Sequence, residues 1–147
     1  MRLPALALLA AASLAGCGED EAELPQEGTL FEYSRAGGIA FSVLEIKIDA
    51  GGTGTVASTT TAEPADTGEF ELTEGEVDEL RSILEEHPIS SLPDPGEPMC
   101  ADCFEHTYAY GGEEITLTEV SEPVPELDDL NEFIDRLPIP DDTANGG

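Results

Sequence analysis

The chain has 147 residues, and its 33 Asp and Glu side chains outnumber five Lys and Arg, which gives a formal net charge of −28 at pH 7. Proteins that neutralise nucleic-acid phosphates need clustered Lys and Arg, so this balance argues strongly against nucleic acid as a partner. The same balance argues against docking on anionic lipid through basic residues. The length of the chain allows one ordinary domain.

The first 16 residues have the features of a secretory signal. Met1-Arg2 precedes an unbroken small and apolar run, Leu3 to Ala15, which is too short to span a bilayer. The end of the run, Leu14-Ala15-Gly16-Cys17, resembles the bacterial lipobox, after which cleavage leaves a diacylated Cys17 as the new N-terminus. The other interpretation is an ordinary secretory signal followed by an incidental cysteine.

Lipidation at Cys17 predicts where the protein resides. Two acyl chains on one residue form a stable anchor, so we expect an extracytoplasmic protein held on the cell membrane or the outer membrane. Removing 16 residues, which hold one base and no acid, leaves a mature chain of 131 residues with a net charge of −29. Residues 17–28 then form the lipidated cysteine and an acidic tether, residues 29–138 a single domain, and residues 139–147 a flexible tail.

The predicted domain begins with three strands. Aromatic residues alternate in 29–35, and Gly37-Gly38 offers a tight turn into a longer apolar stretch, Ile39 to Asp49. That stretch changes face between Val43 and Leu44, so we predict a bulge or a sharp bend at this point. A third strand follows at 54–58, and a polar loop rich in Thr, Pro and Gly comes after it.

Two amphipathic helices are predicted, separated by a second hairpin. Thr73 and Glu76 have the spacing of a capping box, and the helix that they begin ends at His87-Pro88. Gly111-Gly112 fits a two-residue turn between strands at 104–110 and 113–120. The second helix starts at Pro125 and ends before Pro138. We therefore predict an α+β domain, β-β-β-α-β-β-α, with about five antiparallel strands and both helices packed on one sheet face.

Cys100 and Cys103 are the only thiols left once Cys17 carries lipid, and three interpretations of the pair compete. A local disulfide would pin the loop to the following strand in an oxidising compartment. A redox dithiol would place its first cysteine at a helix N-terminus, whereas this pair leads into a strand. A zinc site would use His106 as a third ligand and would still need a fourth, for which only His87 remains. The disulfide is our prediction.

No catalytic constellation is evident, so we predict that the protein is not an enzyme and has no cofactor or metal. His106 alternates with Phe104, Tyr108 and Tyr110, so it is expected on the core-facing side as a hydrogen-bonded residue rather than a catalyst. His87 is a helix-end residue, where a cation interacts favourably with the dipole. His-Glu-x-x-His, Gly-x-Ser-x-Gly and a phosphate-binding loop with Lys are all absent from the sequence.

Several segments together resemble the emfourin-type domain. They are Ser-Arg-Ala-Gly-Gly-Ile-Ala at 34–40, Ile-Ser-Ser-Leu-Pro at 89–93 after an amphipathic helix, and Asp-Cys-Phe-Glu-His-Thr-Tyr at 102–108 before a hairpin and a final helix. The similarity covers Leu30 to Leu137. That family includes small protein inhibitors of thermolysin-like metalloproteases, so the resemblance implies an α+β fold and a protease as partner.

These observations lead to one functional hypothesis and two alternatives. The hypothesis is a non-enzymatic, lipid-anchored extracytoplasmic binding module that restrains a metalloprotease. The first alternative is a thiol- or disulfide-linked redox protein that uses Cys100 and Cys103. The second is an acidic surface domain adapted to high salt, without small-molecule chemistry.

Overall fold

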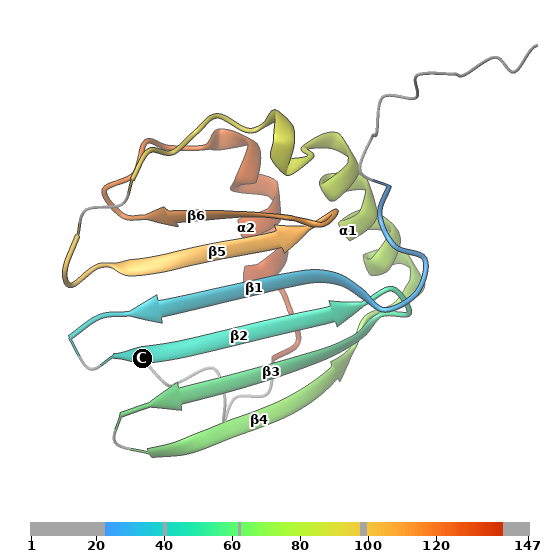
Figure 1. The fold of residues 1–147 in the computed structure, drawn as a ribbon. Helices are drawn as coiled ribbons and strands as arrows, with labels where there is room; N and C mark the ends of the chain where they lie inside the picture. Colours follow the sequence, from blue (N-terminus) through green and yellow to red (C-terminus); the bar gives the residue numbers. More distant parts are fainter. Residues whose placement is uncertain (1–22, 40, 62, 98–99, 140–147) are drawn as a thin grey trace, which may run out of the picture.

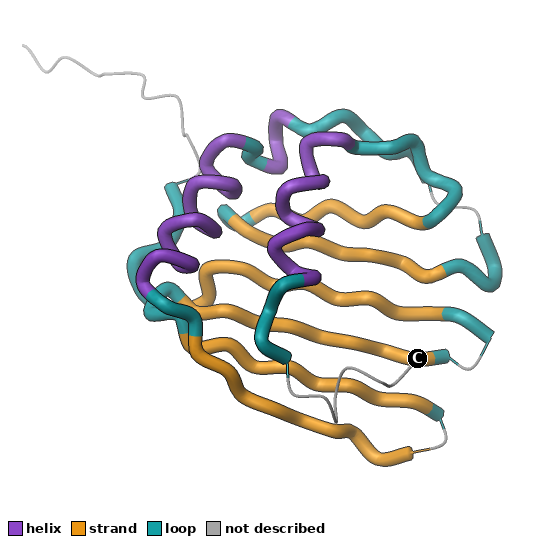
Figure 2. The backbone as a smooth tube through the Cα atoms, turned by 180° about the vertical axis from the view of Figure 1, so that it is seen from behind, coloured by secondary structure: helices purple, strands orange, loops and turns teal. Residues whose placement is uncertain are grey.

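The computed structural model describes residues 23–39, 41–61, 63–97 and 100–139, so Cys17 lies outside the described residues. The described residues form one antiparallel sheet with strand order β4-β3-β2-β1-β5-β6 (Figure 1). Both helices cover the same face of this sheet (Figure 2). The predicted α+β class, an antiparallel sheet with helices on one face, is therefore confirmed.

Six strands and two helices make up the fold. The strands are β1 (Thr29–Gly37), β2 (Ser42–Asp49), β3 (Thr53–Thr60), β4 (Glu63–Glu71), β5 (Phe104–Tyr110) and β6 (Glu113–Thr118). The helices are α1 (Glu74–Glu86) and α2 (Asp128–Asp135), accompanied by short 3-10 helices η1 (Ile89–Ser91) and η2 (Pro125–Leu127).

Strand β4 occupies the segment for which the sequence predicts a polar loop. It pairs antiparallel with β3 and forms one edge of the sheet, which raises the strand count from about five to six. Phe70 is its one large apolar side chain and is buried, whereas Asp66, Glu69 and Glu71 are exposed. An edge strand needs few apolar residues, and charged side chains protect it from pairing with other chains, so hydrophobic periodicity does not reveal it.

The first hairpin corrects the prediction of a bulge at Val43-Leu44. Strand β2 begins only at Ser42, and its register with β1 is regular from Ser42 to Ile48. The apparent change of face arises because Ile39 and Phe41 lie in the turn and not in the strand. The register of this pair shifts instead between Thr29 and Phe31.

The core lies between the helices and the inner face of the sheet, which is the face that they cover. Its most deeply buried side chains come from three central strands and from both helices: Leu30, Phe31, Ile46, Ile48, Val56, Leu80, Leu84 and Leu130. Burying a side chain of this size stabilises the fold by about 1.5–3 kcal/mol. The buried residues of α1 and α2 lie on the apolar faces that make the two predicted helices amphipathic.

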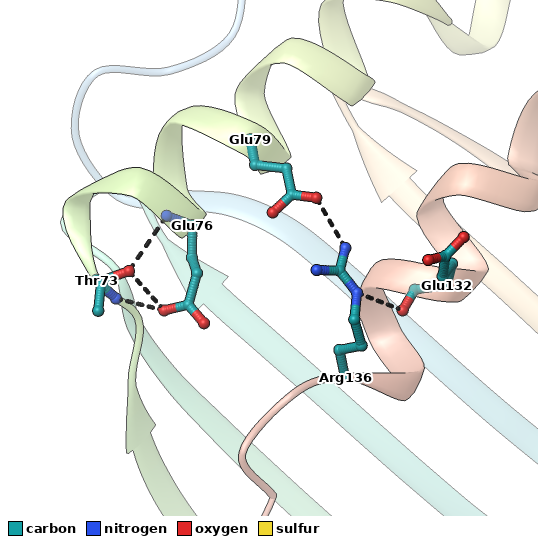
Figure 3. Close-up of polar contacts among 5 residues, drawn as sticks. All are labelled: Thr73, Glu76, Glu79, Glu132 and Arg136. Carbon is teal, nitrogen blue, oxygen red and sulfur yellow. Dashed lines mark hydrogen bonds and ion pairs between the residues drawn. The ribbon is translucent and has the colours of Figure 1, made fainter.

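Polar contacts fix the start of α1 and connect the two helices (Figure 3). The Thr73 hydroxyl accepts a hydrogen bond from the Glu76 amide at 3.3 Å, and the Glu76 carboxylate accepts one from the Thr73 amide at 2.7 Å. The two bonds confirm the predicted capping box. The Thr73 amide and the Thr73 hydroxyl, which donates to the same carboxylate at 2.8 Å, lower the pKa of the Glu76 carboxyl. Arg136, just after α2, donates to Glu79 of α1 at 2.7 Å.

The chain begins to pack on the domain inside the predicted tether. Leu24, the one larger apolar residue of that segment, is buried, and Arg81 of α1 donates to the Pro25 carbonyl at 2.9 Å. The contacts of the domain therefore begin about five residues before β1. Among the described residues, no helix is both long and apolar enough to cross a membrane.

Candidate functional site

A cleft of about 430 Å³ lies between α2 and the β1, β5 and β6 strands on the inner face of the sheet. It is the site with the most varied chemistry in the described part of the chain. Its lining residues are Tyr33, Arg35, His106, Tyr108, Leu117, Thr118, Glu119, Pro123, Val124, Leu127, Asp128, Asn131, Ile134 and Asp135.

Strand pairing explains why distant sequence positions meet in the cleft. In the β1–β5 register, Tyr33 lies opposite Tyr108 and Arg35 lies opposite His106. Side chains two residues apart on a strand point to the same face, so all four lie on the inner face together. The Tyr33 ring lies 5.3 Å from the Tyr108 ring and 6.1 Å from the His106 ring, measured between centroids.

Tyr33 and His106 form a neutral hydrogen-bonded pair. The Tyr33 hydroxyl lies 2.9 Å from His106 Nδ1. Partial burial lowers the pKa of the His106 imidazole, the charge on Arg35 lowers it further, and Glu119 opposes the shift. Burial likewise raises the pKa of the Tyr33 hydroxyl. Both groups are therefore uncharged at neutral pH, and His106 takes the hydrogen-bonded, inward-facing position expected from the sequence.

Tyr108 connects the floor of the cleft to α2. Its hydroxyl donates to the Asn131 side-chain carbonyl at 2.7 Å. Burial raises the pKa of Tyr108, with smaller contributions that include the charge of Asp135. This bond uses the carbonyl oxygen of Asn131 and leaves its amide N–H groups unused.

Arg35 is the cation of the cleft, and its guanidinium lies over the Phe104 ring at 5.1 Å from the centroid. Its Nε is fully buried and has no hydrogen-bond partner in the described part of the chain. The other described cations are engaged: Lys47 pairs with Glu32 at 3.2 Å, and Arg81 and Arg136 make the bonds given above. Among the described cations, Arg35 is therefore the one whose side chain makes neither a hydrogen bond nor an ion pair, although Arg81 also has one buried nitrogen, Nη1, without a partner.

The turn between β1 and β2 is a second candidate site, at the end of the sheet where β1 ends and β2 begins (Figure 1). Ile39 is 97% exposed and Phe41 is 58% exposed. Phe41 also has a φ of 43°, a conformation that bulky residues rarely adopt outside strained turns. Sequence periodicity assigned these two residues to a strand, so it missed this exposed apolar pair.

Two glycines allow the chain before β5 to pack against this turn. A Cβ at Gly37 would collide with the Cys103 carbonyl, and one at Gly38 would lie 2.8 Å from the Phe104 ring. Both glycines also have positive φ, 129° and 75°. The Arg-x-Gly-Gly sequence thus serves close packing, with Arg35 and Gly38 contacting the same aromatic ring.

Cys100 and Cys103 form a disulfide with a Cα–Cα distance of 5.6 Å, and the second cysteine immediately precedes β5. This pairing fits the predicted local disulfide, and it is also what the oxidised form of a redox dithiol would show. Bonded sulfurs provide no thiolate for the zinc alternative. Among the described residues, no group of three or more His, Cys, Asp and Glu side chains is placed to hold a metal ion.

His87 caps the end of α1, as the sequence predicts for a helix-end residue. Its amide donates to the Ile83 carbonyl at 3.2 Å, and its own carbonyl accepts from the Tyr110 hydroxyl at 2.5 Å. His87 and His106 therefore have separate structural partners.

Comparison with known proteins adds no family assignment. No protein-family model matches the chain, and no curated protein sequence matches it.

Proposed function

We propose that this protein is a lipid-anchored, non-enzymatic binding module that acts outside the cytoplasm and contacts a protein partner through the β1–β2 turn. The observation that carries the proposal is the exposure of Ile39 and Phe41, two apolar side chains in the β1–β2 turn. Aromatic and aliphatic anchors of this kind dominate the energetics of protein interfaces.

The position of the turn suits a tethered protein. The first described residues, 23–25, lie near α1 at the opposite end of the sheet from the turn (Figure 1). Those residues continue from the predicted lipidation site, Cys17. The turn therefore lies at the opposite end of the domain from the first described residues.

The resemblance to the emfourin-type domain suggests the class of the partner. Its Arg-x-Gly-Gly segment forms the end of β1 and the beginning of the exposed turn. The partner that we propose is accordingly a thermolysin-like metalloprotease, with the turn entering an apolar pocket of the protease. An inhibitor of this type needs surface complementarity and no catalytic residue of its own.

Peptide hydrolysis by a thermolysin-like protease tests this proposal. The full chain in non-ionic detergent should slow hydrolysis saturably, and the double substitution Ile39→Ser and Phe41→Ser should weaken inhibition by at least about tenfold. Val120→Ser is the matched control, because Val120 is an exposed apolar residue outside the turn. Unchanged hydrolysis at micromolar excess of the protein would contradict the inhibitor proposal.

The anchor requires a separate experiment. Expressed in a bacterium with its own signal, the wild-type protein should sediment with membranes and incorporate labelled fatty acid. Cys17→Ser should appear in the extracytoplasmic soluble fraction without label, because no acyl chain remains to hold it. Equal membrane association of both proteins would contradict lipid anchoring at Cys17.

A further inference from the structure

We propose that the cleft between α2 and the β1–β5–β6 part of the sheet binds a small zwitterion with an apolar portion, of the apolar α-amino acid class. The carboxylate of this ligand binds Arg35, its ammonium group binds the carboxylates at the rim, and its apolar part contacts the aliphatic wall. This site is distinct from the β1–β2 turn and does not depend on the function proposed for that turn.

Arg35 provides the carboxylate-binding group. It lines the cleft, its side chain makes no hydrogen bond or ion pair with the described residues, and its guanidinium carbon lies 5.1 Å from the centroid of the Phe104 ring. Contact with a ring uses no hydrogen-bond donor, so the terminal N–H groups on Nη1 and Nη2 remain to form paired hydrogen bonds to a carboxylate, whereas Nε is buried. None of the acids among the described residues pairs with Arg35, which leaves its guanidinium to an external carboxylate.

The rim of the cleft provides the cation-binding groups. Glu119, Asp128 and Asp135 line it, and none of them forms an ion pair or a side-chain hydrogen bond within the described chain. Two of these charges act on side chains of the cleft: burial and Arg35 lower the pKa of His106 and Glu119 partly offsets that shift, while burial raises the pKa of Tyr33 and Asp135 adds to it. An ammonium group in the cleft would therefore be close to these carboxylates.

The net charge of the protein selects a zwitterion over simpler ions. A field from −28 formal charges opposes the entry of an anion, even one that Arg35 could pair. A simple cation would be attracted to the many exposed carboxylates without preference for the cleft. A zwitterion has no net charge to be repelled, and only a site with both signs of charge can bind both of its ends.

The rest of the lining suits a ligand with an apolar side chain. Leu117, Val124 and Ile134 provide an aliphatic wall, and the neutral Tyr33–His106 pair introduces no competing charge. The volume of about 430 Å³ lies within the range of about 300–1,000 Å³ that is common for small-molecule sites. A depression of about 440 Å³ on the outer face of β2, β3 and β4 lacks this combination, because its cation, Lys47, is paired with Glu32.

Three related probes separate the contributions of the two charges. L-leucine carries both charges, 4-methylpentanoate lacks the ammonium group, and 3-methylbutylamine lacks the carboxylate. Isothermal titration of the full chain in non-ionic detergent, at physiological ionic strength, should show saturable binding of L-leucine with a Kd of about 1 mM or tighter. Each single-charge probe should bind at least about tenfold more weakly, because it loses one charge-assisted contact.

Substitutions then locate the site. Arg35→Gln should weaken L-leucine binding at least about tenfold, while Lys47→Gln, which removes the same charge from the outer face, should leave it within about twofold. Asp135→Asn should weaken L-leucine but not 4-methylpentanoate, and this exposed substitution serves as a second variant if Arg35→Gln fails to fold. Lack of saturation up to about 10 mM, or equal binding of L-leucine and 3-methylbutylamine, would overturn the proposal. Protease inhibition is measured independently, so the two proposals fail separately.

Discussion

At the residue scale, the three tyrosines of the chain share one environment. Tyr33, Tyr108 and Tyr110 are all buried on the inner face of the sheet, with hydroxyl partners on His106, Asn131 and the His87 carbonyl. Burial raises the pKa of all three, and it raises the pKa of Tyr110 to about 12. Each ring therefore contributes apolar contact while its hydroxyl stays protonated.

These raised pKa values predict the response to alkali. The unfolded chain loses tyrosine protons near pH 10, while the folded chain keeps them, so stability falls as pH rises above about 10. Ultraviolet titration should show normal tyrosine ionisation near pH 10 in concentrated urea and less tyrosinate at the same pH in the folded protein. Tyr108→Phe should remove one third of the total signal, because the chain has three tyrosines. A native midpoint near pH 10 would contradict this prediction.

Substitution of Gly38 tests how closely the chain before β5 packs against the β1–β2 turn. Gly38→Ala should destabilise the protein for two reasons: its φ is 75°, and the added methyl would lie 2.8 Å from the Phe104 ring. Gly112→Ala is the matched control, since its φ is 79° and a Cβ there meets open space. Urea denaturation should show a loss of about 1 kcal/mol for the control and at least about 1 kcal/mol more for Gly38→Ala. Equal losses would show that Phe104 does not restrict this position.

At the element scale, the sequence predicted those elements whose local chemistry is sufficient to define them. The capping box at Thr73 and the apolar face of α2 could be recognised from the local sequence, without the rest of the chain. Strand β4 could not be predicted in this way, because an edge strand depends on pairing with its neighbour. The cleft could not be predicted either, because it depends on the pairing of β1 with β5, which connects residues more than 70 positions apart.

Substitution of Cys100 and Cys103 tests whether their disulfide has a structural role or a redox role. Replacing both with Ser releases a short loop at the start of β5 and should cost about 2 kcal/mol of stability. Urea denaturation measures this loss, and protease inhibition should survive wherever the variant remains folded. If the variant keeps its stability but loses all function, the redox alternative is favoured and the structural one is contradicted.

At the scale of the whole molecule, the acidic side chains coat the folded domain. Two ion pairs join described residues, Lys47–Glu32 and Arg136–Glu79, and both involve exposed side chains that contribute little individually. Most of the acids among the described residues therefore form no ion pair, and their repulsion opposes the compact state. The excess of acidic over basic residues is visible in the composition alone, so the sequence was sufficient to predict it.

Salt should relieve this repulsion and stabilise the protein. The Debye length falls from about 10 Å at 0.1 M to about 3 Å at 1 M, so added NaCl screens most pairs of surface carboxylates. We expect Tm to rise by at least about 5 °C over this range, which corresponds to about 1 kcal/mol for a domain of this size. The rise should level off near 1 M if screening causes it, whereas a general solute effect, such as that of sucrose, would continue to increase with concentration. A flat Tm would contradict both the repulsion and the interpretation of the surface as an adaptation to high salt.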